Sequence, residues 1–139
     1  MKTALRNLAT AAALSLAALG ASAQSIHNTY TIPSLAWGFS TTHPVFSQCG
    51  TLSLDATGDI YNSDFFSMYG RLSCPALGGN YATVGSAYFD AANTFNMTMT
   101  LSVTHKMVCN NLSGSTLSGQ CPIFDNLGNQ TGTAFINLL

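Results

Sequence analysis

The chain of 139 residues contains no glutamate and few charges of either sign. Charged residues make up 6% of the sequence, whereas hydrophobic residues make up 47%. Disorder requires the opposite balance, so the composition predicts a folded domain. Only four residues are lysine or arginine. Clusters of these residues hold nucleic acids and anionic membranes, so we expect neither as a partner.

The sequence also lacks the motifs of the common enzyme classes. It has no G-x-S-x-G, no H-E-x-x-H, no Walker loop and no G-x-G-x-x-G. Without glutamate, a glycosidase mechanism would need two aspartates about 5 to 10 Å apart across a cleft. A small secreted hydrolase is therefore a hypothesis for the function that ranks behind the two non-enzymatic ones given below. We assign no catalytic residue and no organic cofactor.

The only long apolar run lies at the N-terminus. Lys2 and Arg6 precede an Ala/Leu-rich segment from Leu8 to Gly20, which ends at Ala21-Ser22-Ala23. These are the three parts of a secretory signal peptide, and the apolar part is shorter than the ~20 residues of a membrane-spanning helix. We expect residues 1–23 to be removed and residues 24–139 to form one β domain in the periplasm or outside the cell.

The sequence contains four cysteines, an even number. In an exported chain such a number predicts disulfides, and the paired spacing of a zinc site is absent. A hairpin centred on Ser115 would place Cys109 opposite Cys121, which leaves Cys49 to pair with Cys74.

Apolar and polar residues alternate most clearly from Phe95 to Thr104. A period of two predicts a β-strand, here with one buried face made by Phe95, Met97, Met99, Leu101 and Val103. The same parity continues through His105, Met107 and Cys109. We interpret His105 as a core histidine, with which His27 and His43 share no ligand spacing. Shorter apolar runs predict further strands at 30–32, 35–39, 51–54, 60–74, 81–89, 117–124 and 133–138.

Turn-forming residues separate these segments, at 56–59, 75–80, 90–93, 110–115 and 125–129. Loops this short join antiparallel neighbours. The sequence therefore predicts an all-β fold, an antiparallel meander of about eight strands that forms a small closed barrel or a β-sandwich and is stapled by two disulfides.

Acidic residues mark alternate turns of this predicted meander. If the count of strands holds, the turns that carry Asp55, Asp59, Asp90 and Asp125 share one end, together with Asn93, Asn126 and Asn129. Loop oxygens of this kind hold Ca²⁺, so one hypothesis is a calcium site at the acidic end. The alternatives are an acidic patch for a partner, or aspartates that only stabilise their own turns.

Aromatic residues are the other candidate contacts. Trp37, Tyr61 and Tyr69 lie near hydrogen-bonding residues, as in a surface that binds a glycan or another protein. Core packing is the alternative interpretation, because aromatic residues are common in strands.

Two classes of function remain open. Charged residues usually protect edge strands, yet none occurs between Asp90 and Lys106. If the barrel closes, we expect a non-enzymatic binding or interaction module. If the edges stay open, we expect strand addition between copies, in a self-assembling subunit of a surface layer, fibre or biofilm matrix.

Overall fold

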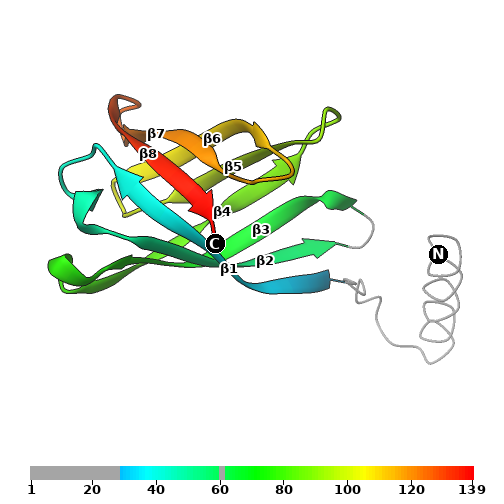
Figure 1. The fold of residues 1–139 in the computed structure, drawn as a ribbon, viewed down its shortest axis with the longest axis horizontal. Coiled ribbons are helices and arrows are strands. Elements are labelled where there is room, and N and C mark those ends of the chain that lie inside the picture. The colour runs from blue at the N-terminus through cyan, green and yellow to red at the C-terminus, as the bar shows by residue number, and fades with distance from the viewer. Residues whose placement is uncertain (1–28, 60–61) are drawn as a thin grey trace, which may run out of the picture.

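The structure, a computed structural model, describes residues 29–59 and 62–139. The predicted signal peptide, His27 and Tyr61 lie outside these residues. Eight strands, each antiparallel to the next, close into a barrel through pairing of the first with the last (Figure 1). The strands are β1 (Thr29–Thr41), β2 (Thr51–Asp59), β3 (Asn62–Cys74), β4 (Gly79–Phe89), β5 (Thr94–Thr100), β6 (His105–Ser113), β7 (Gly119–Asp125) and β8 (Gln130–Leu138). The predicted all-β meander is confirmed, and of its two forms the chain adopts the closed barrel.

Alternation along each strand fills the barrel interior. In β2 every second residue from Leu52 is buried, and in β5 the predicted inward positions Phe95, Met97 and Met99 are all buried. Side chains from all eight strands meet there, and the ring of Trp37 is fully enclosed. An eight-stranded barrel is just wide enough for side chains to fill it. The interior is therefore a packed core.

The prediction of one strand from Phe95 to Thr104 is wrong for the second half of this segment. The strand ends at Thr100, and the chain turns back so that Thr100 pairs with Lys106 and Met99 with Met107. Val103 stands at the tip of this turn and is 95% exposed, not buried. The alternation continues through the turn because residues that face each other across a hairpin point to the same side of the sheet.

Two other segments differ from the expected strands. The runs at 30–32 and 35–39 belong to one strand, β1, whose register with β2 shifts between Ile32 and Leu35. Ser34 at this bulge has a positive φ of 58°. The expected turn at 56–59 is part of β2, whose alternation continues to Asp59. Gly58 leaves room there for the ring of Tyr30, because an added Cβ would lie 2.8 Å from that ring.

Both predicted disulfides are present, Cys49 with Cys74 and Cys109 with Cys121. The second bridge continues the register of β6 and β7 beyond their last paired residues, Met107 and Ile123. Two disulfides indicate an oxidising compartment. No helix among the described residues is long and apolar enough to span a membrane.

Candidate binding surface

The four candidate metal ligands are not gathered at one end of the barrel. Asp90 begins the connection from β4 to β5, whereas Asp125 begins the connection from β7 to β8. Connections three strands apart in a meander lie at opposite ends, so the predicted shared acidic end is wrong. The unforeseen turn between β5 and β6 shifted the count by one strand. Asp55 lies in the middle of β2 and Asp59 at its end.

The carboxylates of Asp90 and Asp125 stabilise their own turns. Oδ1 of Asp90 accepts hydrogen bonds from the backbone N–H groups of Ala92 at 2.9 Å and Thr94 at 3.0 Å, while Oδ2 accepts from the Thr94 hydroxyl. Oδ1 of Asp125 likewise accepts from the N–H groups of Leu127 and Asn129, both at 2.9 Å. Asp90 and Asp125 therefore stabilise their own turns, which was one of the alternatives to a calcium site.

These hydrogen bonds also hold the two carboxylates in their charged form. The Thr94 hydroxyl, then its N–H group, lowers the pKa of Asp90, and the Asn129 side chain, then its N–H group, lowers the pKa of Asp125. Within the described part of the chain, no three residues of the types His, Cys, Asp and Glu are grouped so that they could hold a metal ion.

Two histidines lie together at one end of the barrel. His43, in the connection between β1 and β2, is 5% exposed and packs on Gly132, and its ring centre lies 4.8 Å from that of His105 at the start of β6. Nδ1 of His43 accepts a hydrogen bond from the N–H group of Val45 at 3.2 Å. Burial and then the neighbouring His105 lower the pKa of His43. The pair belongs to the packing of this loop, and sequence spacing did not reveal it.

We predict that the free energy of unfolding falls as pH drops below 6.5, the ordinary pKa of His43. Because the pKa of His43 is lower in the folded state, the unfolded chain binds the proton first as the pH falls. The contribution of neutral His43 to the free energy of unfolding is therefore fully present above pH 6.5 and is lost below it. His43→Asn keeps an acceptor for the Val45 N–H group but does not titrate. Urea unfolding at pH 7.5, 6.5 and 5.5 should therefore show a weaker pH dependence in this variant.

The carboxylates of Asp90 and Asp125 do not contribute in that range, because their pKa values lie below the ordinary 3.8. His105, which faces His43, and Asp125, which pairs with His105 across β6 and β7, remain unchanged in the variant. An equal loss of stability in the wild type and His43→Asn would contradict the assignment to His43.

Of the three candidate ligand-binding aromatics, only Tyr69 lies on the surface of the described residues. Trp37 is a core residue, 0% exposed, and its Nε1 donates a hydrogen bond to the carbonyl of Leu117 at 2.8 Å. Its proposed role in ligand contact is therefore wrong, because a ligand on the surface does not reach it. Tyr61 lies outside the described residues. Tyr69, on the outer face of β3, is 47% exposed.

Tyr69 belongs to a group of exposed apolar side chains on β3 and β4. Tyr69 pairs across the two strands with Val84, and Phe65 pairs with Tyr88. All four side chains are between 46% and 56% exposed. The small residues Ser67 and Ser86 pair between the two rows. We call these four apolar residues and two serines the β3–β4 face.

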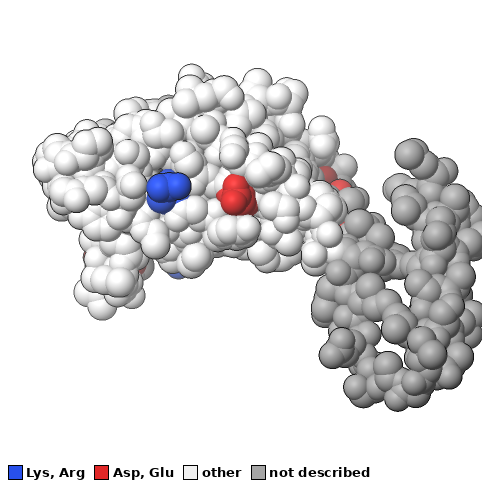
Figure 2. Space-filling model, turned by 90° about the horizontal axis from the view of Figure 1, so that it is seen from below, with Lys and Arg blue, Asp and Glu red and all other residues white. Residues whose placement is uncertain are grey.

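Two opposite charges flank Tyr69 on the same side of the barrel. Asp55 pairs with Tyr69 from β2, and Arg71 follows two residues later on β3. Figure 2 shows the barrel from below, where a basic and an acidic side chain stand apart on a surface that carries little other charge. Oδ1 of Asp55 accepts a hydrogen bond from the Ser34 N–H group at 2.8 Å, which ties this carboxylate to the bulge of β1, the neighbour of β2 on the side away from Tyr69.

The sequence contained part of the signal for this face. In β3 the inward residues Met68, Leu72 and Cys74 share one parity, which directs Tyr69 outward. In β4 both parities carry apolar residues, so Val84 and Tyr88 could not be assigned to either side. Comparison of the chain with protein-family models, with curated proteins and with solved structures found no match.

Proposed function

We propose that this chain is an exported, non-enzymatic binding module, and that the β3–β4 face is its contact surface. The observation that carries the proposal is the pair of adjacent cross-strand rows, Phe65 with Tyr88 and Tyr69 with Val84, exposed to water. Contiguous exposed apolar residues mark interaction sites, whereas single ones are ordinary. The signal-peptide pattern and the two disulfides support action in an oxidising compartment outside the cytoplasm.

Closure of the barrel favours binding over assembly by strand addition. The β1–β8 pairing joins Trp37–Thr41 to Ala134–Leu138, so the first half of β1 has only β2 beside it among the described strands. That half carries Pro33, which has no N–H group to donate, and the bulge at Ser34. Proline and bulges are the features that prevent edge strands from pairing with another chain.

The hydrolase hypothesis has less support. Asp125 lies opposite His105, as an acid beside a catalytic base would. However, its carboxylate accepts three hydrogen bonds from its own turn, and Nδ1 of His105 lies 2.9 Å from the hydroxyl of the adjacent Thr104. These contacts are local to two turns, where they stabilise the backbone conformation.

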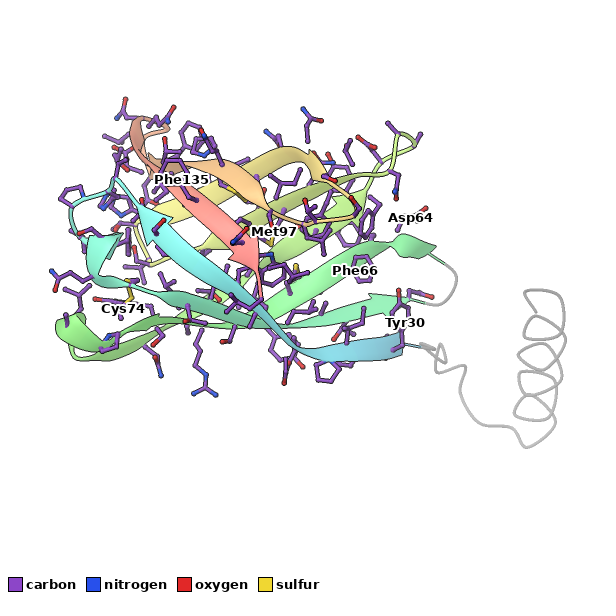
Figure 3. All side chains as sticks on the ribbon, viewed as in Figure 1. Tyr30, Asp64, Phe66, Cys74, Met97 and Phe135 are labelled. Carbon is purple, nitrogen blue, oxygen red and sulfur yellow. A yellow bond between two sulfur atoms is a disulfide. The ribbon has the colours of Figure 1, made fainter. Side chains whose placement is uncertain are left out.

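An array of extracellular glycans and peptides tests the proposal. We expect the protein with both disulfides formed to bind a defined subset, and Tyr69→Ala to weaken this binding at least about tenfold, as for the loss of a central aromatic contact. Phe135→Ala is the matched control. Like Tyr69, Phe135 is an exposed aromatic residue that points outward, but it lies on β8 and not on the β3–β4 face (Figure 3). Equal weakening by both variants, or filaments in light scattering, would count against the proposal.

A further inference from the structure

We infer that the partner of the β3–β4 face is a second copy of this chain, held face to face around a two-fold axis. The inference rests on the proposed function of that face as a contact surface. It differs from strand addition, because the two barrels would meet through outward side chains and leave their backbone hydrogen bonds unchanged. Three features carry it: the opposite charges beside the face, the row of Tyr69 and Val84, and the composition of the face.

The charge pattern is self-complementary. Asp55 lies directly opposite Tyr69, and Arg71 is two residues further along β3, so Asp55 and Arg71 are diagonal neighbours. Diagonal neighbours in an antiparallel sheet lie about 7 to 8 Å apart. A two-fold axis that lies in the interface and passes midway between them exchanges their positions. Asp55 of each copy then faces Arg71 of the other, which makes two ion pairs at once.

The same axis passes beside the apolar row of Tyr69 and Val84. These residues share one cross-strand pair, next to the midpoint between Asp55 and Arg71. In the two-fold arrangement each side chain therefore packs against its own copy, which removes both from water. Tyrosine and arginine are the residues that most often dominate protein interfaces, and here they stand side by side at the centre.

The composition of the face favours a protein surface over a glycan. Val84 and Phe65 are 56% and 46% exposed and have no group that hydrogen-bonds a sugar, so a dry apolar surface is their better complement. The residues between and beside them are small, namely Ser67, Ser86 and Ala82. Two sheets pack closely when such residues separate the large ones. Lysine, which would oppose self-association, is absent from β3 and β4.

Sedimentation equilibrium of the protein with both disulfides formed, from roughly 1 μM to 1 mM, measures the dimer directly. We expect a reversible monomer–dimer equilibrium that Tyr69→Ala weakens at least about tenfold. Phe135→Ala should leave it unchanged. A wild-type protein that stays monomeric over the whole range overturns the inference.

Charge reversal tests the predicted ion pairs. In Asp55→Arg, positions 55 and 71 beside the face are both basic. In Arg71→Asp, both positions are acidic. Each variant alone should dimerise at least about tenfold more weakly than the wild type, because like charges then face each other. An equimolar mixture should recover dimers near the wild-type level, since the two faces are complementary. Lys106→Asp reverses a charge on β6, away from the face, and should change nothing.

Recovery in the mixture is specific to contact between copies, because damage to the fold of either variant would persist after mixing. Dimers that form in the wild type but are not recovered in the mixture overturn the arrangement. A monomeric wild type whose glycan or peptide binding is lost in Tyr69→Ala overturns only the second copy as partner. A Tyr69→Ala variant with unchanged binding and unchanged association overturns the function of the face as well.

Discussion

Gly85→Ala should destabilise the protein by more than about 4 kcal/mol, which is a large part of the roughly 5 to 15 kcal/mol by which domains are stable. Gly85 points into the barrel from β4, between Met68 of β3 and Met99 of β5. An added Cβ would lie 1.9 Å from the carbonyl oxygen of Thr98 and 2.9 Å from Cα of Met99. Both are backbone atoms of the neighbouring strand, so the clash cannot be relieved by a rotamer change and must separate β4 from β5.

Gly70→Ala should have an effect of the same size, because its Cβ would lie 2.0 Å from the Ser53 carbonyl oxygen on β2. The matched control is Gly50→Ala, since no atom lies within 4 Å of the added Cβ and the expected change is within about 0.5 kcal/mol. Urea unfolding followed by far-ultraviolet circular dichroism gives all three values. Gly85→Ala with wild-type stability would mean that the strands do not approach as closely as described.

These glycines explain how strands of ordinary sequence curve into so small a barrel. Strand interiors usually exclude glycine, and where it occurs it marks a tight bend or a close approach of two backbones. Thr83 lies opposite Gly70 in the pairing of β3 with β4, and its hydroxyl is buried without a hydrogen-bond partner among the described residues. The barrel therefore tolerates an unsatisfied polar group on β4 opposite Gly70.

Local patterns in the sequence were sufficient for the fold class and the disulfides. Alternation identified most strands, and the symmetry of Cys109 and Cys121 about Ser115 located one hairpin. The turn from Leu101 to Thr104 was missed because it contains no Gly, Pro, Asn or Asp. The Ser102 hydroxyl takes their place, because its oxygen accepts a hydrogen bond from the Thr104 N–H group at 3.2 Å. One missed turn reversed the end assigned to Asp125.

The candidate surface was predictable only in part, because a face of a barrel combines residues from different strands. Tyr69 was identified from its own segment. Val84 and Tyr88 acquire their role only from the register of β4 against β3, which places them opposite Tyr69 and Phe65. Asp55 was identified for a different reason, as part of an acidic end. Its position beside Tyr69 depends on the register of β2 with β3, which the sequence does not specify by itself.

Trp37→Ala should destabilise the protein by about 3 to 5 kcal/mol, the usual cost of removing a large buried aromatic side chain. Trp37→Phe keeps most of the ring but leaves the carbonyl of Leu117 without its donor, so we expect a loss of about 1 to 3 kcal/mol. Both variants should bind at the β3–β4 face like the wild type, provided that they are measured where they are folded.

Urea unfolding followed by circular dichroism measures these losses, because Trp37 is the only tryptophan and its fluorescence disappears in the variants. Phe135→Ala, which removes an exposed aromatic side chain, should cost no more than about 1 kcal/mol. The indole links β1 to the connection between β6 and β7, so the loss in Trp37→Phe reports on that link together with the ring volume that phenylalanine does not fill. A Trp37→Ala variant with wild-type stability and weakened binding would contradict the assignment of Trp37 to the core.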